Sequence, residues 1–284
     1  MIANWEERIS ATSDALLVGE HEARYGWVRA VVEAAGTWCD LGCGTAAGSS
    51  RALGDVLPER IVLVDADTEA VDEASRALAP HDVDGSTIDL TRRADLDDLG
   101  ARLLAGPGPV ALTCFEVIEH LSDFVPLVEW LGDMAGEGAT VAISVPNDVF
   151  TSVKNPYHVT MWGSSTVAEL RGILPPDHVV AVQTALEGSI IDCGAPVPAE
   201  VTISPERPVD VVPLQYLMGF GPGVGLLGPT AVVLPSDVAA RRVWERQRET
   251  DNLYYRTEAA RVPILEARIA ELEAELGAER TASA

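Results

Sequence analysis

The sequence contains few basic side chains. It has 44 aspartate and glutamate residues against 20 lysine and arginine residues, so its formal net charge is −24 at pH 7. Lys154 is the single lysine, and arginine provides every other fixed positive side chain. A chain with this charge repels polyanions, which argues against long RNA or DNA as a substrate and favours small molecules and neutral glycans.

Long apolar runs and secretion signals are also lacking. A membrane span requires about eighteen apolar residues, and no apolar run is nearly that long. The opening MIANWEERIS has no basic region followed by an apolar one. We therefore expect a cytoplasmic protein without a membrane span. Four cysteines, Cys39, Cys43, Cys114 and Cys193, show no close paired spacing, and we interpret them as reduced, buried thiols.

The most informative stretch runs from Thr37 to Ser49, TWCDLGCGTAAGS. An apolar segment is followed at once by Gly42 and Gly44, and then by the small, helix-compatible residues 46–53. This order predicts a strand, a tight turn and a helix, which is the geometry of a nucleotide-cofactor cradle. With Gly48 the glycine spacing is G-x-G-x-x-x-G, whereas a dinucleotide pyrophosphate calls for G-x-G-x-x-G. A dinucleotide is therefore not the favoured ligand.

Apolar and amphipathic segments alternate after this turn and predict an α/β fold with a doubly wound, mostly parallel sheet of seven strands. Four acidic residues fall at predicted carboxyl ends of strands or just after them, where such sheets bind ligands; they are Asp40, Asp65, Asp89 and Glu116. We expect strands at 37–41, 60–65, 85–88, 109–115, 140–145, 178–185 and 211–217, and helices at 46–56, 68–79, 93–104, 124–135 and 166–174.

The ends of the chain suggest additional helical parts. Residues 1–36 are interpreted as an N-terminal helical cap with two helices between residues 5 and 35, and residues 37–235 as the main domain. The glycine-rich segment 219–229 is interpreted as a loop. Residues 236–284 are interpreted as a helical tail in which Leu265, Ile269, Leu272 and Leu276 recur at heptad spacing, which favours a short coiled coil and a homo-oligomer.

Several motifs in order resemble the class I S-adenosylmethionine-dependent methyltransferases. DLGCGTAAG is similar to the first motif of this family, IVLVDAD to the second and TIDL to the third. The family usually has glycine at the position of Ala46. The resemblance implies a Rossmann-like methyltransferase fold and binding of S-adenosyl-L-methionine. By position, the cofactor would contact Asp40, Gly42, Cys43, Gly44, Asp65, Ala66, Asp89, Leu90 and Phe115. An Arg-Tyr pair often lies near the cofactor in this family, and here the pair would be Arg24 and Tyr25.

The candidate catalytic and metal-binding residues follow the fourth predicted strand, in the sequence FEVIEH. Glu116, Glu119 and His120 are spaced zero, three and four, so they share one face if this segment is helical. His158 belongs to the loop after the fifth strand, whose end is adjacent to that of the fourth. Two carboxylates and two imidazoles can bind a divalent cation such as Mg, Mn, Fe or Zn. His120 and His158 could equally act as bases without a metal, and Glu116 and Glu119 could be structural residues at a helix start.

The motifs around these glutamate and histidine residues resemble those of particular methyltransferases and indicate a type of reaction. E-x-x-E-H with a later histidine resembles the metal site of methyltransferases that modify the terminal ribose of small RNAs, which implies Glu116, Glu119, His120 and His158 as ligands. EVIEHL resembles ubiquinone-pathway O-methyltransferases, and EH followed by NPYH resembles methyltransferases of glycan assembly. We expect an O-methyltransferase acting on a small molecule, with a sugar or glycan favoured and a divalent metal such as Mg as a candidate cofactor. The alternatives are a catechol or polyketide aromatic O-methyltransferase, a non-catalytic cofactor-binding partner protein and, more weakly, a nicotinamide-dependent oxidoreductase.

Overall fold

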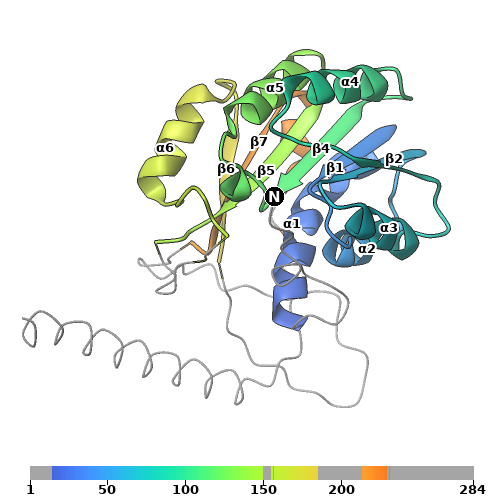
Figure 1. Cartoon of the computed structure of the whole chain (residues 1–284), viewed down its shortest axis with the longest axis horizontal. Helices are drawn as coiled ribbons and strands as arrows, with labels where there is room; N and C mark the ends of the chain where they lie inside the picture. The colour runs from blue at the N-terminus through green and yellow to red at the C-terminus, as the bar shows by residue number, and fades with distance from the viewer. Residues whose placement is uncertain (1–14, 150–154, 156, 185–212, 229, 231–284) are drawn as a thin grey trace, which may run out of the picture. The chain divides into compact units, whose positions relative to one another are not determined.

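The computed structural model describes residues 15–149, 155, 157–184, 213–228 and 230, to which all structural statements below refer. These residues form one seven-stranded sheet with the order β3-β2-β1-β4-β5-β7-β6 (Figure 1). The first five strands pair in parallel, while β7 is antiparallel to β5 and β6. This confirms the expected mostly parallel α/β sheet. The strands are β1 Thr37–Leu41, β2 Arg60–Asp65, β3 Val83–Thr87, β4 Val110–Phe115, β5 Thr140–Pro146, β6 Val179–Gln183 and β7 Gln215–Phe220.

Helices cover both faces of the sheet, with α4 and α5 on one face and α1, α2 and α3 on the other (Figure 1). This arrangement follows from the crossovers between parallel strands, each of which places a helix against the sheet. The helices are α1 Ala15–Glu33, α2 Ala47–Leu53, α3 Thr68–Ala77, α4 Arg93–Leu104, α5 Val125–Gly136 and α6 Ser164–Ile173, with short 3-10 helices η1 Ile118–His120 and η2 Pro222–Leu226.

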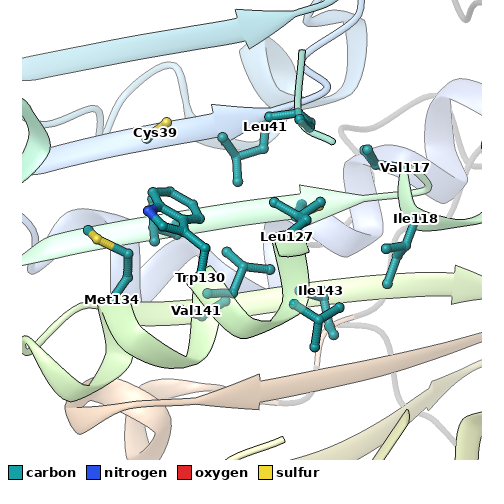
Figure 2. Packing of buried hydrophobic residues seen from close by; sticks show 14 of the residues in the cluster. Cys39, Leu41, Val117, Ile118, Leu127, Trp130, Met134, Val141 and Ile143 are labelled. Carbon is teal, nitrogen blue, oxygen red and sulfur yellow. The ribbon is translucent and has the colours of Figure 1, made fainter. Parts of the chain in front are cut away.

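The central strands β1, β4 and β5 are buried at every residue, as a parallel sheet covered on both faces requires. Alternate side chains therefore enter different cores. Cys39 and Leu41 belong to the same core as Trp130 of α5 (Figure 2), whereas Trp38 packs on the opposite face against Tyr25 of α1, with ring centroids 6.4 Å apart. The two cores hold the carboxyl ends of β1, β4 and β5 at one edge.

The structure corrects several predicted boundaries. The helix before β1 is α1, which runs from Ala15 to Glu33, and the other helix expected after residue 5 falls largely on residues 1–14, outside the described residues. The last described strand, β7, runs from Gln215 to Phe220 rather than from 211 to 217, so it enters the segment interpreted as a glycine-rich loop. Gly219 suits this strand because a Cβ there would lie 2.2 Å from Leu227 and 3.5 Å from a β5 carbonyl. The glycine marks close packing rather than a loop.

None of the described helices is both long and apolar enough to cross a membrane. Cys39, Cys43 and Cys114 are free and buried, as expected. Cys193, residues 1–14 of the predicted cap and the predicted helical tail with its coiled coil lie outside the described residues.

Candidate active site

The glycine turn after β1 has an alternating left-handed backbone. The φ angles are 72° at Gly42, 52° at Gly44 and 57° at Ala46. The amide of Gly42 donates to the carbonyl of Val64 at 2.7 Å, which ties the turn to the end of β2. A Cβ on Gly42 would lie 2.4 Å from a methyl group of Val117, whereas nothing lies within 4 Å of a Cβ built on Gly44. The open side of Gly44 leaves room for a ligand to approach the backbone.

Ala46 and Gly48 have different structural roles. Ala46 adopts the left-handed conformation in which glycine is the usual residue, at a cost of roughly 1–2 kcal/mol for a residue with a Cβ. Gly48 lies within α2, where a Cβ would come 2.7 Å from the Cβ and 3.1 Å from the carbonyl carbon of His21. Gly48 therefore allows α2 to pack closely on α1. It does not supply the glycine that the turn lacks at Ala46.

Asp65, at the end of β2, accepts backbone hydrogen bonds around the turn. Its Oδ2 accepts from the amide of Gly44 at 3.0 Å, and its Oδ1 accepts from the amide of Asp67 at 3.0 Å. Ala66, the next residue, is exposed, whereas Cys43, which lies within the glycine turn, is buried. The Asp65 carboxylate thus lies beside the glycine backbone, where the cofactor prediction requires it.

Asp40 on β1 is fully buried between two hydroxyl groups. Tyr25 donates to its Oδ2 at 2.7 Å, and Thr113 on β4 donates to its Oδ1 at 2.6 Å. Burial raises the pKa of Asp40 to about 7, although the hydrogen bonds from Thr113 and Tyr25 act in the opposite direction. Both carboxylate oxygens of Asp40 therefore have protein partners, and Tyr25 is committed to this contact.

The remaining predicted cofactor residues lie at the same strand edge. Asp89 accepts hydrogen bonds from the amide and hydroxyl of Thr91 at 3.0 and 2.7 Å, and these bonds hold the pKa of its carboxyl below the usual value. Leu90 is buried in the core on the α4 side. Phe115, at the end of β4, packs edge-on against Tyr25 with ring centroids 5.2 Å apart. Leu90 and Phe115 are thus core residues that belong to different cores on the two faces of the sheet.

Glu119, His120 and His158 come together beyond β4 and β5. Each offers one ligand atom, and the three atoms lie within 4.8 Å of one another. The Nε2 of His120 is 3.8 Å from Oε1 of Glu119, and the two imidazole rings have centroids 5.1 Å apart. The loop of His158 is fastened to η1 because the amide of Val159 donates to the carbonyl of Glu119 at 2.8 Å.

The carboxylate of Glu119 has no hydrogen-bond partner within the described part of the chain, although the side chain is fully buried. Burial, followed by repulsion from Glu116, raises the pKa of Glu119 well above its ordinary value. A buried carboxylate without a hydrogen bond is costly, and a bound cation is one of the few groups that can stabilise its charge. Glu119 therefore fits a cation site better than a purely structural role.

Glu116 does not lie on a helical turn with Glu119 and His120. Its backbone is left-handed, with φ of 55°, and the 3-10 turn begins only at Ile118. The Glu116 carboxylate accepts from the hydroxyl of Ser144 on β5 at 2.7 Å. The expectation of a shared helical face is wrong, because the chain bends sharply at Glu116 on leaving β4. Glu116 lies outside the group of three ligand atoms.

Three residues around this site were not predicted from the sequence: Asp148 and Asn155, which contact His158, and Ser144, which contacts Glu116. Asp148 Oδ1 lies 2.6 Å from Nδ1 of His158, and Asn155 Nδ2 lies 2.9 Å from its Nε2. Asp148 lies two residues after the end of β5, as Asp65 ends β2 and Glu116 follows β4, so the carboxyl-end rule would have found it. Ser144 is a strand-interior residue with no such signal.

Arg24 is almost completely buried beside Tyr25. Its Nη1 donates to Oε1 of Gln183 at 2.9 Å, while its Nε has no partner among the described residues. A buried guanidinium with an unsatisfied donor suits an anionic group of a ligand better than plain packing.

No protein-family model and no curated protein matches the sequence. Among solved structures, an S-adenosylmethionine-dependent methyltransferase from Archaeoglobus fulgidus is 13% identical, with 73% of this chain and 99% of that chain covered and a TM-score of 0.45. The methyltransferase domain of bacterial CtHen1-C is 21% identical, with coverages of 71% and 98% and a TM-score of 0.43. The N-methyltransferase NodS from Bradyrhizobium japonicum is 13% identical, with coverages of 72% and 96% and a TM-score of 0.43.

The order and direction of the strands define the fold. The order is β3-β2-β1-β4-β5-β7-β6 with β7 alone reversed, and the glycine turn follows β1. This is the class I methyltransferase fold. The carboxyl edge of β1, β2, β4 and β5 carries the glycine turn, Asp65 and the cluster of Glu119, His120 and His158.

Proposed function

We propose that this protein is an S-adenosylmethionine-dependent O-methyltransferase in which a divalent cation assists the reaction. The observation that carries the proposal is the cluster of Glu119, His120 and His158 at the cofactor edge of a methyltransferase fold. The carboxyl group of Glu119 is buried there without a hydrogen-bond partner in the described structure.

The glycine turn supports the cofactor assignment. Its open backbone at Gly44 and the neighbouring Asp65 are the groups that would contact the methionine and ribose parts of the cofactor. Arg24, buried with an unsatisfied Nε, is a candidate partner for the cofactor carboxylate. Asp40 would act indirectly in this scheme, since Tyr25 and Thr113 occupy its two oxygens.

The donor set supports a divalent cation. One carboxylate and two imidazoles are ligands that Mn, Fe, Co and Zn accept readily, and Mg binds through the carboxylate with water in its other positions. Glu119, His120 and His158 would hold the cation, and Glu116 would remain bonded to Ser144 at its side. A cation bound there would lower the pKa of a coordinated hydroxyl group.

The reaction is an in-line displacement. The acceptor oxygen forms a bond to the methyl carbon while the bond between that carbon and the sulfonium sulfur breaks, and the sulfur keeps the electron pair. With a cation bound to the imidazoles, the acidified hydroxyl would release its proton to water, whereas without a cation His120 or His158 is the candidate base. The chain's other task is to hold the acceptor oxygen about 3 Å from the methyl carbon.

A neutral acceptor with two adjacent oxygens suits this site, and we favour a sugar or glycan hydroxyl over a catechol or polyketide hydroxyl. The net charge of −24 supports a neutral acceptor. A second candidate mechanism uses no metal. It is favoured by the short contact between His158 and Asp148, because a carboxylate bonded to Nδ1 fixes the orientation of the ring and leaves Nε2 as the nitrogen that accepts a proton.

Calorimetry tests the proposal directly. Mn²⁺ and Mg²⁺ are titrated separately into protein saturated with S-adenosylhomocysteine, for wild type, His158→Ala and the control His81→Ala, whose side chain is exposed. We expect one site in wild type and in the control. In His158→Ala the affinity should fall by about 100-fold or more, because one of three protein ligands is lost.

Each other outcome has a distinct meaning. Absence of binding in wild type contradicts metal assistance and moves the histidine-base mechanism ahead. Formation of S-adenosylhomocysteine from a panel of sugars, catechols and RNA ends tests catalysis itself. Cofactor binding without turnover on every acceptor would instead support the non-catalytic partner protein.

A further inference from the structure

His158 is hydrogen-bonded through both ring nitrogens. Its Nδ1 lies 2.6 Å from Oδ1 of Asp148, and its Nε2 lies 2.9 Å from Nδ2 of Asn155. The Oδ1 of Asn155 accepts from the amide of Tyr157 at 3.0 Å, which turns the Asn155 amide nitrogen toward the ring. Because an ionised carboxylate only accepts and an amide nitrogen only donates, these contacts place the proton on Nδ1 and the lone pair on Nε2.

Asp148 is itself rigidly held. Its side chain is 4% exposed, its Oδ2 accepts from the amide of Trp162 at 2.7 Å, and its own amide donates to the Trp162 carbonyl at 2.9 Å. The preceding residue, Asn147, is fastened to the segment before β7 by its amide and its side chain. Asp148 therefore connects the end of β5 to the loop that carries His158.

We propose that Asp148 is a positioning residue that holds His158 in the Nδ1-protonated tautomer and so directs a lone pair from Nε2. This inference rests on the proposed function for its purpose, because a lone pair on a fixed nitrogen is what a metal ligand or a base requires. His120 is held in the same way. Its Nδ1 lies 3.2 Å from the carbonyl of Tyr157, while its Nε2 faces Glu119.

The substitution Asp148→Asn tests the tautomer without any metal. The asparagine oxygen can still accept from Trp162, but its amide nitrogen would donate to Nδ1 of His158 and move the ring proton to Nε2. Nitrogen-15 shifts of the histidine rings, measured on neutral metal-free protein, distinguish the two forms. We expect an Nδ1 proton on His158 in wild type and in the exposed control Asp177→Asn, and an Nε2 proton in Asp148→Asn. An Nε2 proton in wild type overturns the proposal without recourse to any variant.

Mn²⁺ affinity is the second readout. We expect Asp148→Asn to weaken binding by about 10–100-fold, as loss of an outer partner of a metal-bound histidine does, with Asp177→Asn unchanged. Equal affinity in wild type and Asp148→Asn overturns the proposal. If wild type binds no Mn²⁺ yet shows the expected tautomers, the metal site of the proposed function fails and the positioning role of Asp148 stands.

Discussion

The environment of Asp40 shows how a buried carboxylate in the first motif is kept in place. Tyr25, 15 residues earlier in the chain, and Thr113 on β4 each donate a hydroxyl to it. These bonds offset only part of the cost of burial, so the pKa of Asp40 remains raised, to about 7. The folded protein therefore binds a proton on Asp40 more tightly than the unfolded chain does.

The substitution Asp40→Asn should change how stability depends on pH. Between the unfolded pKa of 3.8 and the folded pKa of about 7 the folded state holds the extra proton. The stabilisation from Asp40 is full below this window and is lost as pH rises through it, by up to about 1.4 kcal/mol per pH unit. Urea unfolding at several pH values from about 5 to 8 should show that the free energy of unfolding of the variant increases relative to that of wild type as pH rises.

Asp89→Asn is the matched control for this experiment. The pKa of Asp89 is lowered by its bonds to Thr91, so its contribution is lost only as pH falls through the acidic range. Its difference from wild type should stay constant from about pH 5 to pH 8. A constant difference for Asp40→Asn as well would contradict the raised pKa.

The contact between α1 and α2 depends on Gly48. His21 of α1 lies so close that a Cβ on Gly48 would meet its side chain and its backbone. Gly132 of α5 is different, because nothing lies within 4 Å of a Cβ built there. Two helical glycines thus predict opposite effects of the same substitution.

We expect Gly48→Ala to lower the free energy of unfolding by about 1–3 kcal/mol, because the helices must move apart. Gly132→Ala should leave it unchanged or raise it by about 0.5–1 kcal/mol, because alanine is the better helix former. Chemical denaturation of both variants measures the two effects. Similar losses in both variants would refute the close contact at Gly48.

The charge of the whole molecule bears on the acceptor. The net charge is −24, and several described arginines are paired with aspartates: Arg29 with Asp55, Arg60 with Asp84, and Arg93 with Asp97 and Asp133. Paired guanidinium groups contribute little attraction for phosphates. A polyanion therefore meets a repulsive field.

A short, labelled single-stranded RNA should show no measurable binding at about 0.15 M salt in fluorescence anisotropy, with or without S-adenosylhomocysteine. Neutral acceptors would be methylated under the same conditions. Tight RNA binding that weakens steeply with added salt would contradict the neutral-acceptor proposal and point to a local basic surface.

The sequence alone determined the α/β order of elements, the glycine turn and the acidic residues at the strand ends. Those features depend on local backbone preferences and on the periodic burial of apolar side chains. Both are set by residues that are close together in the sequence. Only the tertiary structure decided which acidic residues act together. Glu116 accepts a hydrogen bond from Ser144, whereas Glu119 lies close to His120 and His158. Asp148 is hydrogen-bonded to His158. Such contacts join residues of different strands and loops, so they exist only after the sheet has assembled its carboxyl edge.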